Sequence, residues 1–136
     1  MERIVVSGKR KEATARAAVG PGKGIVRINS VLLDNYMPKM ARERIRQVFL
    51  ISDGMVDFSK LDVGIIVEGG GFMGQSEAAA CALSRALVAY TKNDDLKEAI
   101  VKYDRTLIAG DHRQTEVHKP SQSSKGPRHK RQKSYR

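Results

Sequence analysis

The most constraining feature of the sequence is an apolar segment, a glycine-rich turn and an alanine-rich segment in direct succession. Residues 61–67 are almost wholly apolar, which is typical of a strand inside a sheet. Residues 69–74 read GGGFMG and residues 75–90 read QSEAAACALSRALVAY, which predicts a turn and then a helix. The small side chains of this helix allow it to lie close to the sheet.

Three shorter segments that precede this unit have the composition of β-strands. They cover residues 3–6, 13–19 and 25–28, and the sequence GPGKG between the last two is a strong turn signal. Because short connections join the three segments, we expect a meander of antiparallel strands.

A helix with one apolar face is predicted to begin at Pro38, where the missing N–H does no harm, and to end before Gly54. Its apolar positions recur at three- and four-residue spacing: Met37, Met40, Ala41, Ile45, Val48, Phe49 and Ser52. A further helix is expected over residues 96–103, after a cap at residues 93–95.

Length and composition indicate one domain with a modest core. The chain has 136 residues, enough to bury a core without disulfides or metal, but aromatic residues make up only 5% of it and Trp is absent. Cys81 is the only cysteine, so no internal disulfide can form. We expect a soluble, intracellular protein, because the first residues do not resemble a signal peptide and no stretch approaches the roughly 20 apolar residues that span a membrane.

The positive charge is concentrated towards the C-terminus. The chain has 25 Lys and Arg against 15 Asp and Glu, and this net charge of +10 is typical of proteins that bind nucleic acids. Residues 117–136 hold seven of the basic residues and no acidic one, so the other 116 residues carry only +3. Apolar content falls after Asp111, which predicts a globular domain over residues 1–111 and an extended basic tail over residues 112–136.

The glycine-rich turn permits three interpretations. Gly69, Gly71 and Gly74 match the G-x-G-x-x-G pattern of dinucleotide-binding folds, but such a fold needs a second parallel strand that ends in an acidic residue about 20 residues later. That distance reaches residues 93–95, between two predicted helices. The other interpretations are geometric, because glycine permits positive φ and close backbone approach, or functional, with N–H groups at the helix start facing an RNA phosphate.

Metal binding and covalent catalysis have little support in the sequence. His112, His118 and His129 have a spacing unlike that of a zinc site, and a lone Cys81 in an alanine-rich helix is typical of a core. The acidic residues are dispersed and form no obvious catalytic pair. We therefore expect no cofactor, no metal and no enzymatic activity.

Basic clusters are the functional signal that remains. Lys9-Arg10-Lys11 is expected in a loop between strands, and Arg42 and Arg46 lie one turn apart on the polar face of the first helix, although either group can be solvated surface. Residues 117–136 of the tail are different in degree, because their seven cations without an acid predict a polyanionic partner. A nuclear address or an anionic membrane could also attract it, but Tyr135 is its only large apolar residue, so we expect no membrane partner.

Three stretches of the sequence carry a family resemblance. They are GKRKEATAR at residues 8–16, followed by GPGKG; GGGFMGQSEA at residues 69–78; and QKSYR at residues 132–136. Through them the chain resembles, essentially end to end, the family of the ninth protein of the small ribosomal subunit, and the last stretch resembles its archaeal and eukaryotic branch. The chain departs from the family between Asp111 and Arg128, where Ser and Gln replace a tighter run of Arg, Lys and Gly.

The resemblance implies an α+β fold: a mixed four-stranded sheet with helices packed on one face and a left-handed β-α-β crossover, as in the second domain of the fifth small-subunit protein. It implies that the protein is cytoplasmic, on the ribosome, and lies in the head of the small subunit against ribosomal RNA and neighbouring ribosomal proteins. It also implies that the tail reaches the anticodon stem-loop of peptidyl-site transfer RNA.

Two sets of site residues follow from the basic clusters and the resemblance together. The four last residues are expected to contact transfer RNA: Lys133, Ser134, Tyr135 and Arg136. Ribosomal RNA contacts are expected from residues in the hairpin, the first helix, the glycine-rich turn and the tail: Lys9, Arg10, Lys11, Arg16, Arg42, Arg46, Gly70, Gly71, Gln75, Arg113, Lys119, Lys125, Arg128, Lys130 and Arg131.

Two alternatives belong to other functional classes. One is a nucleotide-binding enzyme, because the same general fold resembles that of small-molecule kinases, although no Lys or Asp is placed for phosphoryl transfer or magnesium. The other is a free RNA or DNA chaperone with a basic arm. Neither alternative has a small-molecule substrate that the sequence identifies, and we expect none.

Overall fold

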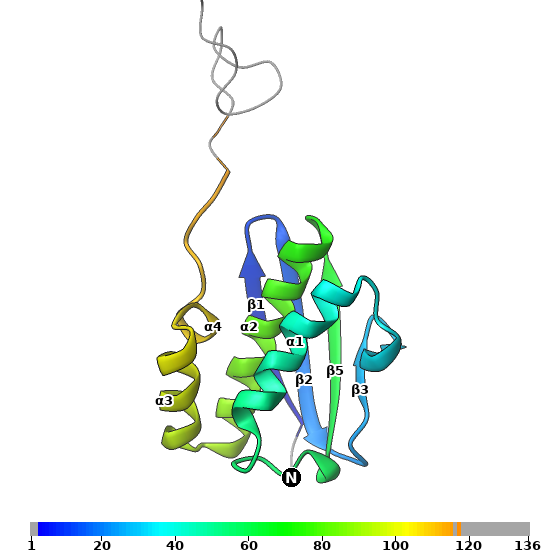
Figure 1. Ribbon diagram of the computed structural model, residues 1–136, viewed down its shortest axis with the longest axis vertical. Helices are drawn as coiled ribbons and strands as arrows, with labels where there is room; N and C mark the ends of the chain where they lie inside the picture. The colour runs from blue at the N-terminus through cyan, green and yellow to red at the C-terminus, as the bar shows by residue number, and fades with distance from the viewer. Residues whose placement is uncertain (1–2, 116, 118–136) are drawn as a thin grey trace, which may run out of the picture.

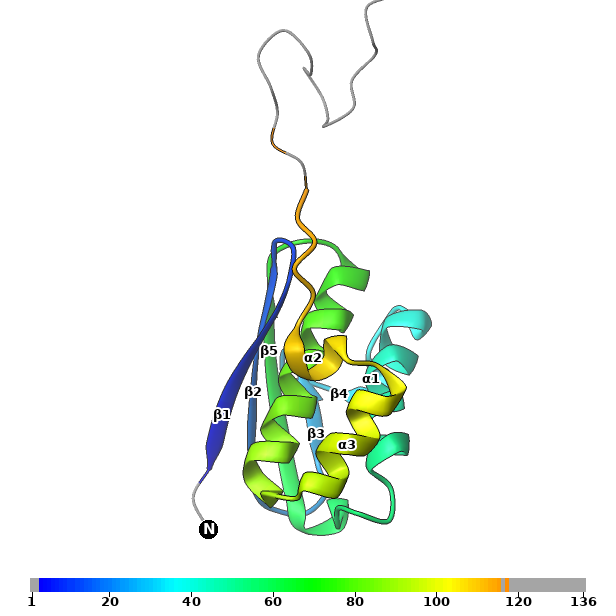
Figure 2. The same ribbon diagram turned by 90° about the vertical axis from the view of Figure 1, so that its left-hand side faces the viewer.

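The computed structural model describes residues 3–115 and 117 as a five-stranded sheet with helices on one of its faces (Figures 1 and 2). The strands are β1 (Ile4–Arg10), β2 (Ala13–Pro21), β3 (Val26–Ile28), β4 (Val31–Leu32) and β5 (Leu61–Glu68). The helices are α1 (Lys39–Ser52), α2 (Phe72–Thr91), α3 (Asp94–Tyr103) and α4 (Thr106–Ala109), with the short 3-10 helices η1 (Leu33–Asn35) and η2 (Phe58–Lys60) before α1 and β5.

The sheet has the strand order β1-β2-β5-β3-β4. All neighbouring strands are antiparallel except β3 and β5, which run parallel and are connected through α1. The predicted meander is therefore wrong after its first hairpin, because β5 occupies the place beside β2 that β3 was expected to take. The expected four strands become five through the two-residue edge strand β4. The left-handed crossover stays a prediction.

The long strand β5 lies in the middle of the sheet, as its apolar composition predicted. Its residues alternate strictly between the two faces, with Leu61, Val63, Ile65 and Val67 buried under the helices. The opposite face is open, and Ile66 on it is 59% exposed. A nearly continuous apolar sequence thus marks a strand with neighbours on both edges, not one covered on both faces.

Small residues on the inner face of the sheet allow α2 to pack very close to it. Ala13, Ala15 and Ala17 of β2 are fully buried and meet a helix that is itself rich in alanine. A Cβ built on Gly8 of β1 would lie 2.5 Å from the backbone nitrogen of Ala82. The close packing predicted for the alanine-rich helix is confirmed, and Gly8 is the residue of β1 that makes it sterically feasible.

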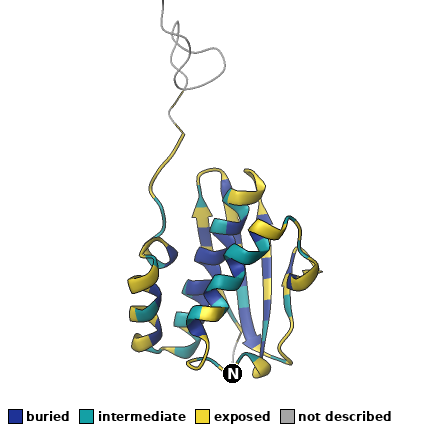
Figure 3. Ribbon diagram, viewed as in Figure 1, coloured by how far each residue is buried: buried dark blue, intermediate teal, exposed yellow. Residues whose placement is uncertain are grey.

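Helix α1 covers the rest of the inner face with a narrower apolar stripe than the sequence predicts. Ala41, Ile45 and Val48 are fully buried, but Met37 and Met40 at the start of the predicted stripe are 73% and 70% exposed. Figure 3 shows buried, intermediate and exposed residues following one another along the helices. The prediction is wrong at the two methionines because Met37 precedes the first helical residue, Lys39, and because Met40 lies on the outer side of a turn whose buried residue is Ala41.

The C-terminal elements lie on the same side of the sheet as α2. Asn93 caps α3 by accepting a hydrogen bond from the Asp95 N–H at 2.9 Å, so the predicted cap is confirmed and the helix begins two residues earlier than expected. After α4, residues 110–115 have no regular secondary structure and lead away from the domain (Figure 1). The division into a domain of residues 1–111 and a tail of residues 112–136 stays a prediction.

Candidate RNA-binding surface

Two of the three predicted basic residues in the first hairpin are available to solvent. Lys9 and Arg10 end β1, and the turn to β2 contains Lys11 in a left-handed conformation (φ 51°) followed by Glu12. Lys9 and Lys11 are exposed, whereas only 14% of the Arg10 side chain is accessible. The turn is shorter than the expected loop, because the hairpin pairing extends to Arg10 and Ala13.

The glycine-rich turn packs directly on the tip of this hairpin. Gly69 and Gly70 have positive φ, and a Cβ on Gly69 would lie 2.5 Å from the carbonyl oxygen of Glu12. The geometric interpretation of these glycines is confirmed. Two segments nearly 60 residues apart in the sequence therefore form one end of the molecule, and Gly70 and Gly71 remain exposed there.

The start of α2 contributes polar backbone to the same end of the molecule. Gly71 precedes the helix and provides no side-chain cap. The Gln75 side-chain amide donates a hydrogen bond to the Gly69 carbonyl oxygen at 3.0 Å, so this residue braces the turn. The N–H groups of a first helical turn attract anions, as the functional interpretation of the turn requires.

The two arginines predicted on α1 have acceptors outside the hairpin and the glycine-rich turn: a backbone carbonyl oxygen and a carboxylate for Arg42, and two carboxylates for Arg46. Arg42 donates to the Asp34 carbonyl oxygen at 2.6 Å, and Arg46 forms ion pairs with the carboxylates of Asp34 and Glu43. These partners lie in η1 and α1, outside the hairpin and the glycine-rich turn. The structure does not join the two arginines to the basic end of the molecule, and their RNA contact stays a prediction.

The first tail residue of the predicted RNA-binding set lies close to the hairpin. Arg113 forms a forked ion pair with Asp111, and Asp111 also pairs with Arg10 at 2.9 Å. Arg113 nevertheless keeps 69% of its side-chain surface exposed. The other predicted tail residues lie outside the described residues: Lys119, Lys125, Arg128, Lys130, Arg131, Lys133, Ser134, Tyr135 and Arg136.

Arg16 lies on the open face of the sheet, away from the helices. It pairs across β2 and β5 with Ile66, and Arg27 of β3 occupies the neighbouring row opposite Gly64. Both arginines are exposed, and the glycine at position 64 places no side chain on this face beside Arg27. Arg27 is not among the RNA-binding residues that the sequence predicts, because its position beside β5 follows only from the strand order.

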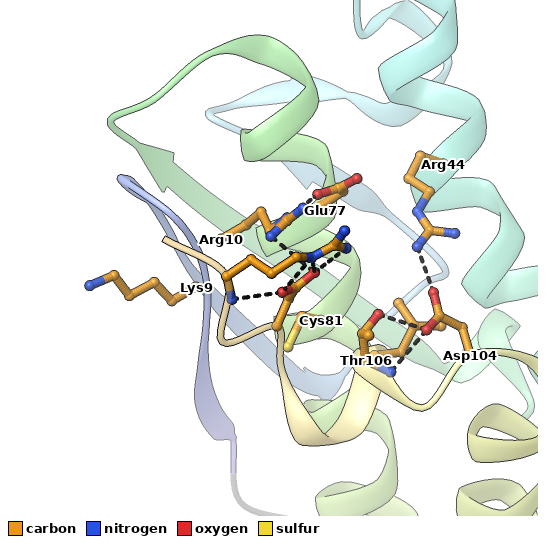
Figure 4. Close-up of a pocket in the computed structure, with 10 residues that line it drawn as sticks. Lys9, Arg10, Arg44, Glu77, Cys81, Asp104 and Thr106 are labelled. Carbon is orange, nitrogen blue, oxygen red and sulfur yellow. Dashed lines mark hydrogen bonds and ion pairs between the residues drawn. The ribbon is translucent and has the colours of Figure 1, made fainter. Parts of the chain in front are cut away.

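A shallow polar cavity lies between the hairpin, α2 and the C-terminal segment (Figure 4). Cys81 lines it but is only 4% exposed, and burial raises the pKa of its thiol, which therefore stays protonated near neutral pH. In the described part of the chain no three His, Cys, Asp or Glu side chains are grouped as a metal site requires. The cavity does not present a nucleophile or a metal centre.

Two carboxylates at this cavity, those of Asp104 and Asp111, are held in their charged form. Burial alone would raise the pKa of Asp104, but hydrogen bonds from Thr106 and Arg44 lower it below its usual value. Hydrogen bonds from the side chain and backbone of Arg113 lower the pKa of Asp111 further, with Arg10 adding to the effect. Asp104 and Asp111 each have an arginine partner, whereas Lys9, which also lines the cavity, is exposed to solvent.

None of the described helices has the length and apolar character needed to cross a membrane. Comparison with known proteins gives a consistent result over the full chain. Residues 8–136 match the family described as ribosomal protein S9/S16. Proteins called small ribosomal subunit protein uS9 from two strains of Methanococcus maripaludis are 45% and 44% identical to this chain, and the one from Methanococcus vannielii is 42% identical. In all three comparisons the whole of both chains is covered.

Proposed function

The chain belongs to the ribosomal protein S9/S16 family and is a structural constituent of the small ribosomal subunit, and we propose that it binds ribosomal RNA in the subunit head through one end of its domain. That end consists of the hairpin tip, the glycine-rich turn and the start of the tail, and we call it the basic end. The archaeal branch expected from the last residues agrees with the Methanococcus relatives.

The observation that supports this proposal is the meeting of three segments distant in sequence. Lys9 and Lys11 come from the hairpin, Gly70 and Gly71 from the turn before α2, and Arg113 from the start of the tail (Figure 1). Side-chain cations beside exposed backbone N–H groups are what a sugar–phosphate backbone binds. Such contacts position an RNA strand without reading its base sequence.

The tail extends this contact. Residues 117–136 hold seven cations and follow the basic end in sequence, so an RNA strand bound at the basic end can continue along the tail. We propose that the last four residues reach the anticodon stem-loop of peptidyl-site transfer RNA, with Arg136 gripping a phosphate and Tyr135 stacking on a base or sugar. These residues lie outside the described part of the chain.

The functional alternatives differ from this proposal in a measurable way. The family is one of structural ribosomal proteins, which are not enzymes, so the kinase-like interpretation is set aside. A free RNA chaperone would sediment as a monomer in a cell extract. A ribosomal constituent co-migrates with the small subunit after washing at moderate salt.

The basic end is tested by a double substitution in the hairpin. Lys9→Ala with Lys11→Ala should weaken binding to small-subunit ribosomal RNA by about tenfold and flatten the log–log salt dependence by about 1.4, at about 0.7 for each lost phosphate contact. Lys97→Ala with Lys102→Ala is the matched control, because both lysines are exposed and lie on α3, which is not part of the basic end. Equal losses in the two variants would mean that only the total charge matters.

The transfer RNA contact needs a separate measurement on assembled subunits. Deleting residues 133–136 should leave assembly intact and weaken binding of deacylated transfer RNA to the peptidyl site by a few-fold to tenfold, or about 1 kcal/mol. Filter binding with purified subunits measures this. Unchanged affinity would refute the contact, and failed assembly would make the tip a scaffold element.

A further inference from the structure

The chain that follows α3 is fastened to the domain by three arginines, one from each of three different elements. α1, α2 and β1 supply one guanidinium each, and each guanidinium reaches a different point of residues 104–111. The contacts are Arg44 with the Asp104 carboxylate at 2.8 Å, Arg85 with the Ile108 carbonyl oxygen at 2.7 Å, and Arg10 with the Asp111 carboxylate at 2.9 Å.

The last of these contacts belongs to a row of four charged side chains of alternating sign. Arg10 bridges two carboxylates, with Glu77 of α2 at 2.5 Å on one side and Asp111 on the other (Figure 4). Asp111 in turn accepts hydrogen bonds from the backbone and the guanidinium of Arg113. Two cations and two anions therefore neutralise one another, and we call this set the Arg10 network.

Within the Arg10 network, the pair of Arg10 with Asp111 is sheltered from water, whereas Arg113 at its outer end is exposed. Only 14% of the Arg10 side chain and 10% of the Asp111 side chain are exposed, compared with 38% and 82% in the pair of Arg46 with Asp34. Salt screens sheltered pairs much less than exposed ones. The pair of Arg10 with Asp111 therefore persists at ionic strengths that weaken contacts between exposed lysines and RNA phosphates.

The position of the network gives it a specific consequence. Asp111 is where the apolar part of the sequence ends, and beyond Leu107 and Ile108 no side chain of this segment packs into the core. In Figure 4 Lys9 points away from the network into solvent, while Arg10, its neighbour in β1, points into it. The network thus fixes the start of the tail beside the exposed lysines of the hairpin.

We propose that Arg10 and Asp111 are positioning residues that hold the first tail residues against the hairpin, so that the tail and Lys9 and Lys11 engage one continuous RNA strand. This inference rests on the proposed RNA binding by the basic end and the tail. Arg10 itself is then an internal strut and not the RNA contact that the sequence predicts. A tethered second site binds with an effective concentration that falls as the flexible connection lengthens, so a released segment weakens the combined contact.

The substitution Asp111→Asn separates this proposal from simple charge effects. Removing an acidic side chain raises the net charge by one, which by itself should strengthen binding to RNA, by up to about twofold. If Asp111 positions the tail, its loss leaves Arg10 and Arg113 facing each other without their shared anion, and affinity should instead fall by about threefold. The two explanations therefore predict opposite signs.

The measurement is binding of full-length small-subunit ribosomal RNA, transcribed in vitro, to the intact protein at two salt concentrations. Glu98→Gln is the matched control, since Glu98 is an exposed acid on α3 outside the network. The same Asp111→Asn substitution in a chain ending at residue 117 should have no weakening effect, because the seven cations of residues 119–136 that the network positions are then absent. Amide exchange of α2 reports whether the core of the variant is intact.

Each outcome decides the matter. Weaker binding that requires the tail, with α2 protection unchanged, supports the proposal. Tighter binding equal to that of Glu98→Gln, or equal weakening in the truncated chain, overturns it. RNA binding by the parent chain that the tail does not enhance would overturn the proposed function itself.

Discussion

Helix α2 and the segment after α3 pack on the same side of the sheet through two different kinds of contact. α2 lies against Gly8, Ala13 and Ala15, where small side chains bring backbone close to backbone. The segment from Asp104 to Asp111 buries Leu107 in the core, and both of its ends are held by arginine side chains from three elements. Shape therefore determines the position of α2, and charge determines where the tail begins. The first should be insensitive to pH and salt, and the second should change without loss of the fold.

The largest expected effect is on the shape-determined contact. Gly8→Ala places a Cβ 2.5 Å from the Ala82 backbone nitrogen, and because backbone cannot yield easily, we expect a loss of about 3 kcal/mol in unfolding free energy. Gly64→Ala is the control, since its Cβ meets nothing within 4 Å on the open face. Chemical denaturation measures both, and similar stabilities of the two variants would contradict the close packing of α2.

A smaller effect is expected from the charge-determined contact. Arg85→Met keeps the aliphatic length but removes the hydrogen bonds to the carbonyl oxygens of Ile108 and Ser7, which should cost about 1–2 kcal/mol. Amide exchange should accelerate in α4 and not in the middle of α2. Lys97→Met, on the exposed side of α3, should change neither, and uniform acceleration in both helices would contradict separate attachment.

Acid should loosen the segment after α3 before it affects α2. The folded pKa values of Asp104 and Asp111 lie below the usual value of about 4, so the unfolded state binds protons more readily. Their contribution to stability is complete above that usual value and is lost as pH falls through the lower folded values. The backbone amides of Thr106 and Arg113 donate hydrogen bonds to these two carboxylates. NMR titration should show chemical-shift changes at both amides only below about pH 4. Midpoints above that value would refute the sign of both shifts.

The smallest effect on stability should come from deleting the tail. Removing residues 118–136 should change the unfolding free energy by less than about 0.5 kcal/mol, as expected for substitutions remote from the core. The same deletion should flatten the log–log salt dependence of RNA binding by roughly 5, because seven cations at about 0.7 each are lost. An unaltered salt dependence would mean that the tail is not an electrostatic contact.

Some residues have surroundings that their local sequence does not indicate, because these surroundings come from distant segments. The helical spacing on α1 places Met40 with Ile45 and Val48, yet Met40 is exposed, and its neighbour Ala41 is the residue of that turn that is buried. Arg10 and Lys11 read alike in a basic triplet, yet Arg10 meets a glutamate 67 residues away and Lys11 faces solvent. Charge alone does not distinguish a strut from a ligand-binding residue.

The sequence by itself determined the features that depend on neighbours along the chain. The strand at residues 61–67, the glycine-rich turn, the alanine-rich helix and the Asn93 cap follow from periodicity and local hydrogen bonding, which need no knowledge of the fold. The concentration of cations after residue 117 is likewise a property of the chain alone.

Only the tertiary structure decided the strand order and the partners of the arginines. β3 pairs with β5 and not with β2, and Arg10, Arg44 and Arg85 bind inside the protein. The physical reason is that strand pairing and ion pairing join groups through space, and the free energy of each pair depends on which other segments already surround it. An arginine is therefore held inside the protein at position 10 and exposed to solvent at position 16, a difference that the local sequence does not show.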